Sequence, residues 1–385
     1  MNLPTLLLAL FPVLGVEAAH PETRASEVIR DRCQVILDAL VEGPIPGASA
    51  ALVLPDGEVL RIVAGVVSEE SGEDLEPDHL LLVGSTGKTF VTAAVHRLIA
   101  EGKLDLDARA VSYFDDEPEW IAELPNAKEV TVLQLLRHQT GIPRYVFEDE
   151  FTSLMAGEPE RMWKPEELLA FVSDARPLFA PGEGWAYSDT NYIVLGLIIE
   201  KVSGTTFYDY VREHFVDRFK LTHTLPTDRT RLPNMAQGHV VMGRSMGVPE
   251  RTLIDGVFAY NVQFEWCGGG WASTPADLAR WTRILYAGHA VDGPYLDTLL
   301  DAVPAAELGP GARYGLGVIL RDTPAGPAIG HDGFMPGYLT ALAWYPEANV
   351  AGAIQLNCDD GRAVGRPLAQ VLAELAQIAA EELAR

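Results

Sequence analysis

The strand-like segments of this chain are confined to its two ends, and this distribution limits the folds that it can adopt. Residues 47–54 and 58–67 are rich in Val, Ile, Leu and Ala, and a Pro-Asp-Gly turn joins them, which predicts a β-hairpin. The same composition returns far along the chain, in residues 315–320, 338–345 and 350–356. The economical architecture is therefore one antiparallel sheet to which both ends of the chain contribute.

Helical patterns fill the remaining parts of the chain. Residues 25–41 and 366–383 carry apolar residues at helical spacing, so we expect two terminal helices that cover the sheet. Residues from about 105 to 300 have the pattern of helices joined by long loops. The sequence therefore predicts an α+β fold in which an all-helical lobe is inserted into the sheet-containing lobe.

This architecture gives a single domain over residues 19–385. The α/β lobe is expected at about 25–84 and 312–385, and the helical lobe at about 85–311. Ligand sites form preferentially in clefts between such parts, so we expect the functional site at the junction of the two lobes.

Residues 1–18 have the pattern of a signal peptide. The apolar run at 6–16 is too short to span a bilayer, and Val16 and Ala18 suit a cleavage site after Ala18. The segment lacks the usual basic residues, and the alternative is an extension of the first helix. We expect a secreted or periplasmic protein.

The formal net charge of -25 excludes several classes of partner. So acidic a chain is not expected to bind nucleic acid or anionic membranes, and no other segment is long and apolar enough to cross a bilayer. No C-x-x-C or H-E-x-x-H motif occurs, and three widely separated cysteines do not indicate a disulfide framework. We expect no metal or cofactor, and a small-molecule or peptide substrate as partner; the oligomeric state is not set by the sequence.

Ser85 and Lys88 form an S-x-x-K motif at the start of a predicted helix that reaches about Ala100. Residues three apart on a helix share one face, so the lysine lies one turn from the serine. A serine hydroxyl is a weak nucleophile without a base beside it, and burial lowers the pKa of a lysine so that it can be that base. The alternative is a serine that only caps the helix.

Two further motifs follow in the chain, Tyr187-Ser188-Asp189 and His331-Asp332-Gly333. Together with S-x-x-K they form a variant of the set S-x-x-K, S-D-N and K-T-G, in the same order. Other phrases support this match at residues 138–143, 181–182 and 269–274. Over residues 25–375 the chain resembles the β-lactamase-like serine hydrolases, namely class C β-lactamases, DD-carboxypeptidases, D-aminopeptidases and family VIII esterases.

The resemblance implies roles for individual residues. Ser85 would be the acylated nucleophile, and Lys88 would take or share its proton. Tyr187 would be a second acid and base, which is useful only with cations nearby, such as Lys88 and a protonated His331. His331 would also hold substrate. The backbone N–H groups of Ser85 and Phe334 would form the oxyanion hole, with no metal.

The chain departs from the family pattern at two acids. Asp189 replaces the usual asparagine of the tyrosine motif, and it either caps a helix expected to begin at Asn191 or contacts substrate. Asp332 stands where relatives often carry a hydroxyl or glycine. With Gly333, these acids are the candidate substrate-binding residues. An aspartate here would repel a substrate carboxylate unless it points away, which favours a neutral ester or a substrate with a free amine.

The predicted function is a serine hydrolase that cleaves an ester, amide or peptide through a Ser85 acyl-enzyme. The alternatives are a D-alanyl-D-alanine carboxypeptidase, a class C-like β-lactamase, or a catalytically silent protein of the penicillin-binding type. All four implied catalytic residues are present, which favours an enzyme. Ser245 lies in a G-x-S-x-G motif, but Pro249 argues against the helix that a nucleophile elbow needs, so we expect a turn there.

Overall fold

The computed structural model describes residues 23–114 and 118–385, so the predicted signal segment lies outside the described residues. Its centre is an eight-stranded antiparallel sheet with the strand order β2-β1-β13-β12-β11-β10-β9-β8. The strands are β1 (Gly47–Val53), β2 (Val59–Gly65), β8 (Val303–Pro304), β9 (Arg313–Tyr314), β10 (Ile319–Thr323), β11 (Gly326–Met335), β12 (Tyr338–Tyr345) and β13 (Val350–Leu356). The α+β prediction is confirmed.

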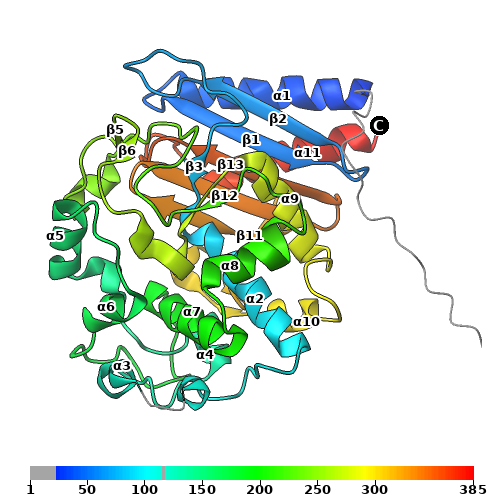
Figure 1. Cartoon of the computed structure of the whole chain (residues 1–385). Coiled ribbons are helices and arrows are strands. Elements are labelled where there is room, and N and C mark those ends of the chain that lie inside the picture. Colours follow the sequence, from blue (N-terminus) through cyan, green and yellow to red (C-terminus); the bar gives the residue numbers. More distant parts are fainter. Residues whose placement is uncertain (1–22, 115–117) are drawn as a thin grey trace, which may run out of the picture.

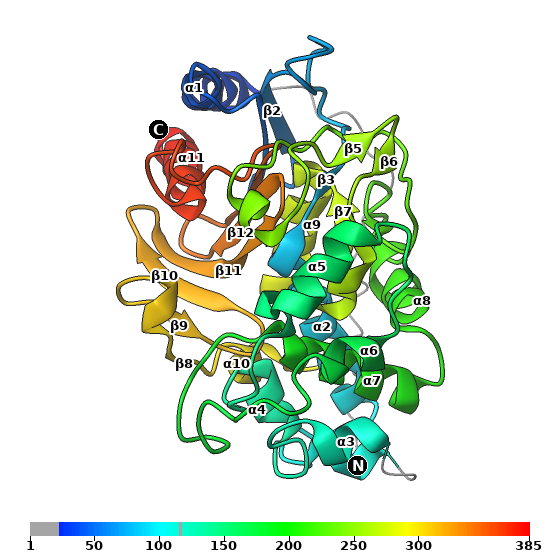
Figure 2. The ribbon, with the colours of Figure 1, turned by 90° about the vertical axis from the view of Figure 1, so that its left-hand side faces the viewer.

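Strands from the two ends of the chain are neighbours inside this sheet, where β1 is the second strand and β13 the third. β1 runs antiparallel to β13, with Ala48 opposite Leu356 and Val53 opposite Ala351. The terminal helices α1 (Arg24–Val41) and α11 (Leu368–Leu383) pack together on one face, where they bury residues such as Ile29 and Leu372 (Figures 1 and 2). The predicted sheet from both ends, flanked by terminal helices, is therefore present.

The other face of the sheet is covered by α9 (Pro275–Tyr286), which packs against β1, β12 and β13. Both α9 and β8 precede residue 311, so they lie inside the range expected for the helical lobe although they belong to the sheet-containing lobe. The two lobes are therefore not divided at a single position in the sequence. An amphipathic helix and two-residue strands carry little local information about which lobe they join.

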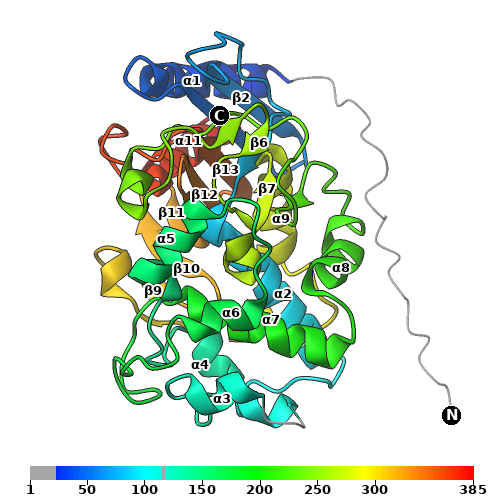
Figure 3. The ribbon, with the colours of Figure 1, turned by 60° about the vertical axis from the view of Figure 1, so that its left-hand side comes forward.

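The helical lobe surrounds α2 (Lys88–Ala100) and α7 (Asp189–Ser203), which lie side by side (Figure 3). Its other helices are α3 (Glu119–Glu123), α4 (Val132–Leu136), α5 (Asp149–Gly157), α6 (Pro165–Ala170), α8 (Phe207–Val211) and α10 (Leu296–Leu299). Short strands complete the fold: β3 (Leu81–Leu82), β7 (Trp271–Ser273) and β4 (Leu225–Pro226) form one sheet, and β5 (Leu253–Ile254) and β6 (Val257–Phe258) another. No helix in the described ranges is long and apolar enough to cross a membrane.

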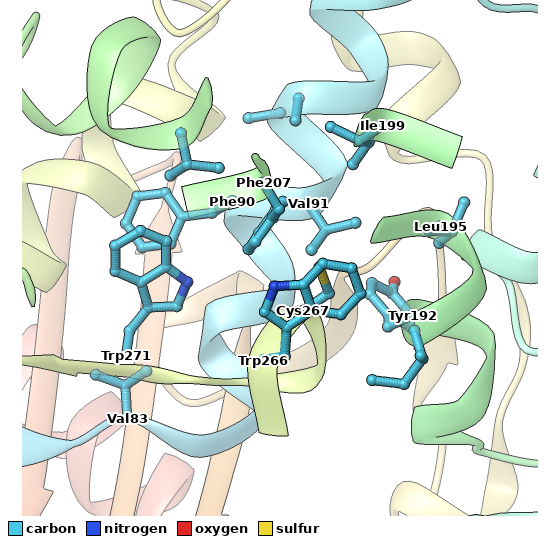
Figure 4. Close-up of a cluster of buried hydrophobic side chains, with 14 of the residues drawn as sticks. Val83, Phe90, Val91, Tyr192, Leu195, Ile199, Phe207, Trp266, Cys267 and Trp271 are labelled. Carbon is cyan, nitrogen blue, oxygen red and sulfur yellow. The ribbon is translucent and has the colours of Figure 1, made fainter. Parts of the chain in front are cut away.

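Aromatic packing around α2 holds the first motif in place. Phe90 stacks on Trp281 with ring centroids 4.5 Å apart and also contacts Trp271 at 5.2 Å. Figure 4 shows Val91 and the α7 residue Tyr192 in the same buried cluster. Because protein cores are close-packed, a helix enclosed in this way presents its first turn at a fixed position.

Candidate active site

Ser85 lies in a short 3-10 turn, Gly84–Gly87, that runs directly into α2. Gly84 has a φ of 54°, and a Cβ there would lie 2.8 Å from the backbone nitrogen of Phe334. A side chain at Gly333 would overlap the carbonyl of Val83. These two glycines therefore let the end of β11 approach the serine closely. The structure brings together Ser85 and the backbone of Phe334, the two predicted oxyanion-hole residues.

The Lys88 side chain is fully buried and uses all three of its ammonium hydrogens. Nζ donates to Ser85 Oγ at 3.0 Å, to Asp189 Oδ1 at 2.7 Å and to the carbonyl of Gly268 at 2.5 Å. Burial alone lowers the pKa of Lys88, but Asp189 and its other anionic neighbours outweigh burial, so the net shift is upward. The lysine is a cation at rest. The interpretation of Lys88 as a base whose pKa is lowered by burial therefore needs correction, whereas the cation expected beside Tyr187 is present.

Asp189 explains why the lysine keeps its proton. This carboxylate is 1% exposed; Oδ1 accepts from Lys88, and Oδ2 accepts from Arg144 at 2.7 and 3.0 Å. Burial raises its pKa, but the two cations together hold the pKa of Asp189 below its usual value. The helix begins at Asp189 itself, two residues earlier than expected, and no side chain caps it. Asp189 therefore bridges Lys88 and Arg144. Its interpretation from sequence, as a helix cap or a substrate contact, did not include this role.

Tyr187 lies against the same pair of cations. Lys88 Nζ is 5.1 Å from the centroid of its ring, and the Arg144 guanidinium carbon is 5.2 Å from it. Burial raises the pKa of Tyr187, and the nearby Lys88 offsets only part of this effect. Tyr187 is therefore a neutral phenol at rest, and its ionised form would be stabilised by two positive charges.

His331 is held by hydrogen bonds at both ring nitrogens. Nε2 is 3.1 Å from Tyr314 Oη, and Nδ1 is 2.6 Å from the carbonyl oxygen of Asp332, so Nδ1 must carry a hydrogen. Tyr314 Oη also lies 3.2 Å from Nε2 of His138, whose Nδ1 accepts from the backbone of Ser188. One chain of donors satisfies all these contacts: His138 donates to Tyr314, Tyr314 to His331, and His331 to the carbonyl.

This arrangement makes His331 neutral. Burial, followed by the charge of Lys88, lowers the pKa of His331 to about 4. The expectation of a protonated His331 beside Tyr187 is therefore wrong, because sequence cannot show that the imidazole is buried beside a permanent cation. Arg144 is a second cation beside the Tyr187 ring, and the sequence did not indicate it.

The neutral state of His331 predicts a stability change with pH. The pKa is about 4 in the folded protein and 6.5 in the unfolded chain, so the folded state binds fewer protons between these values. Its contribution of about 3 kcal/mol is fully present above pH 6.5 and is lost as the pH falls to 4. Urea unfolding of the wild type and His331→Gln from pH 4 to 7 measures this. The variant should show the smaller loss, and equal losses would contradict the assignment.

Asp332 is also paired. Its carboxylate accepts from Arg321 of the neighbouring strand β10 at 2.5 and 3.2 Å, and the side chain is 43% exposed. The repulsion of a substrate carboxylate, expected for an isolated aspartate, is therefore offset by an adjacent cation. Glycine is required at position 333 because a side chain there would overlap the carbonyl of Val83.

Ser245 lies in a 3-10 turn, Met242–Met246, and its hydroxyl donates to the carbonyl of Met242 at 3.0 Å. No strand-turn-helix surrounds it, so the predicted turn is confirmed. The three cysteines are buried and free, and no cluster of metal-binding side chains occurs within residues 23–114 and 118–385.

The site can be compared with known proteins. A family model described as Beta-lactamase matches residues 33–377. The chain belongs to the Beta-lactamase family. It is similar to Penicillin-binding protein 4 of Amycolatopsis lactamdurans, with 26% identity over 83% of each chain, and to Esterase EstB of Burkholderia gladioli, with 33% identity over 45% of each. A D-stereospecific amidohydrolase from Streptomyces sp. superposes with a TM-score of 0.75 and 26% identity, over 87% of this chain and 97% of that one.

These relatives establish the chain as a serine hydrolase of the Beta-lactamase family. The matched part spans less than half of Esterase EstB, and 59% of Penicillin-binding protein 4* of Bacillus subtilis. The relatives differ in the substrates that their names state, so family membership alone does not select a substrate.

Proposed function

We propose that the protein hydrolyses small esters or amides through a covalent intermediate on Ser85. The observation that carries the proposal is the 3.0 Å hydrogen bond from the Lys88 ammonium to Ser85 Oγ, in a site that also contains Tyr187. A cation that donates to the hydroxyl stabilises the alkoxide as it forms.

The proposed acylation begins with transfer of the Ser85 proton to Tyr187. The small fraction of Tyr187 that is ionised, stabilised by Lys88 and Arg144, accepts this proton while Oγ attacks the substrate carbonyl carbon. The carbonyl oxygen becomes negative and accepts hydrogen bonds from the N–H groups of Ser85 and Phe334, each of which can lower the barrier by about 3 kcal/mol. Tyr187 then gives the proton to the leaving alcohol or amine.

Deacylation repeats these steps with water. Tyr187 takes a proton from water, the hydroxide attacks the acyl carbon, and Ser85 Oγ leaves and recovers the proton. Because Lys88 keeps its charge through both steps, its role is electrostatic, whereas Tyr187 moves the proton. Export of the enzyme is a further part of the proposal, and it rests only on the pattern of residues 1–18.

The charges at the site support the proposed substrate class. Both candidate acids are paired with arginines, so neither presents an unbalanced charge to a substrate. A neutral ester or an amide suits such a site. Similarity to Penicillin-binding protein 4 supports a D-alanyl-D-alanine carboxypeptidase or a β-lactamase as the alternative.

Covalent labelling and a substrate panel test the proposal. A fluorophosphonate should label the wild type, and mass spectrometry should place the adduct on Ser85; Ser245→Ala should label as well as the wild type. The panel contains nitrocefin, short-chain p-nitrophenyl esters, D-amino amides and D-alanyl peptides. Faster hydrolysis of peptides or nitrocefin than of esters and amides would favour the alternative. Absence of labelling by both a fluorophosphonate and a fluorescent penicillin would favour a binding protein.

A further inference from the structure

Glu265 is a buried acid that the proposed reaction does not use. It lies in the 3-10 segment Gln263–Gly268 and is 7% exposed. Its Oε2 atom is buried and has no hydrogen-bond partner among the residues that the structure describes. A carboxylate without partners is costly to bury, so such a group either holds a proton or balances nearby positive charge.

One glycine separates Glu265 from the catalytic cation. A Cβ on Gly268 would lie 2.8 Å from Glu265 Oε2 and 3.8 Å from Asp189 Cβ. The carbonyl of this same glycine accepts the 2.5 Å hydrogen bond from Lys88 Nζ. The acid is therefore separated from the ammonium group by a single residue, and because Lys88 is fully buried and Glu265 is 7% exposed, water screens the two charges only weakly.

Several elements contribute the groups that face Glu265. The charged ones are Lys88 from α2, Arg144 from the loop before α5, and Asp189 from α7. Buried neighbours of Glu265 that are neutral because burial raises their pKa values are Tyr145, Tyr208, Tyr260 and Cys267. Within the described residues, the charges that act most strongly here are those of Lys88 and Arg144 set against those of Asp189 and Glu265.

The protonation of Glu265 sets the net charge of this cluster. With Glu265 neutral, the two cations and Asp189 leave one positive charge; with Glu265 ionised, the cluster is neutral. Burial, and then the charge of Asp189, raises the pKa of Glu265 to about 7, although Lys88 and Arg144 oppose the shift. The change of net charge thus falls near neutral pH.

We propose that Glu265 is a positioning residue of the acylation site that controls the charge of the Lys88 cluster and, through it, the reactivity of Ser85. The inference rests on the proposed function. When Glu265 is neutral, the net positive charge favours the anions that form on Ser85 and on the substrate oxygen. When Glu265 is ionised, it raises the pKa of Lys88 and cancels that positive charge, so acylation slows.

Kinetics of Glu265→Gln test this inference, because glutamine has the same shape and stays neutral. The ratio of kcat/KM of the variant to that of the wild type, for a p-nitrophenyl ester, should be near one below pH 6. Above pH 8 it should rise to on the order of ten, since only the wild type gains a negative charge beside the cluster. Glu200→Gln, a half-buried acid near the end of α7 whose carboxylate accepts from Phe207, is the matched control and should give a ratio that does not change with pH.

The outcomes separate the two proposals. If the wild type is not labelled by a fluorophosphonate, the proposed function fails. If it is labelled but the Glu265→Gln ratio is independent of pH, only the inference fails, because loss of packing would act equally at every pH. Infrared spectra of the wild type give a measurement that does not depend on folding of the variant. A carboxylic-acid C=O band that disappears as the pH rises through about 7 supports the inference, and its absence overturns it.

Discussion

An Asp189→Ala variant is expected to lose about 3–5 kcal/mol of unfolding free energy, because it leaves the buried Lys88 and the partly exposed Arg144 without their shared partner. Lys88 and Arg144 both bind this carboxylate, and Lys88 is fully buried. The variant should also lose most of its activity, since Lys88 is then free to leave Ser85. Urea unfolding at pH 7 and ester hydrolysis measure the two effects.

Two further variants test whether the loss of stability in Asp189→Ala comes from the unpaired cations. Asp332→Ala breaks the half-exposed pair with Arg321 and should cost less than about 1 kcal/mol. Asp189→Asn keeps the shape and one acceptor oxygen but removes the charge that raises the pKa of Lys88. It should therefore retain more stability than the alanine variant and lower the pKa of the lysine. An Asp189→Ala variant as stable as Asp332→Ala would contradict the structural role.

Tyr187→Phe should reduce kcat by roughly 10²- to 10⁴-fold, the usual contribution of a group that transfers the proton in the rate-determining step. KM for a neutral ester should change little, because the ring and its cationic neighbours remain. Stability should also change little, since Tyr187 Oη is buried without a hydrogen-bond partner among the described residues. Steady-state kinetics and thermal unfolding provide these values.

Tyr192 offers a matched control for this variant. Its ring centroid lies 5.2 Å from Lys88 Nζ, nearly the same distance as for Tyr187, but its hydroxyl donates to the carbonyl of Leu136 at 3.2 Å. Tyr192→Phe should therefore lose about 1 kcal/mol of stability with little change in kcat. If both variants had the same kcat, Tyr187 would not be the residue that moves the proton.

The parts of the site that the sequence predicted are those fixed by short spacing and chain order. Ser85 and Lys88 are one turn apart, and the ordered motifs at Tyr187 and His331 led to the family and the fold. Arg144, Tyr314 and Glu265 were not predicted. Each acts through a side chain from a distant element, and no local pattern specifies which buried groups will meet in the folded protein.

Charge states were harder to predict than positions. The S-x-x-K spacing suggested a lysine whose pKa is lowered by burial, and the resemblance suggested a protonated His331, whereas the pKa of Lys88 is raised and that of His331 is lowered. The reason is that a pKa depends on burial and on the nearest charges, and both come from the packed structure. The sequence indicated Asp189 as a helix cap or a substrate contact. In the structure it is the carboxylate that raises the pKa of Lys88.

The pairing of β1 with β13 also affects how the protein can fold. These strands are neighbours inside the sheet although about 300 residues separate them, so the sheet cannot be completed until nearly the whole chain is available. Until then, one edge of the β1–β2 hairpin has no partner and is open to pairing with other chains. We therefore expect slow refolding that competes with aggregation, and a growing chain that needs protection during synthesis. The serine and its oxyanion hole come together only when the Gly84–Gly87 turn packs against the end of β11, so we expect the active site to be assembled late.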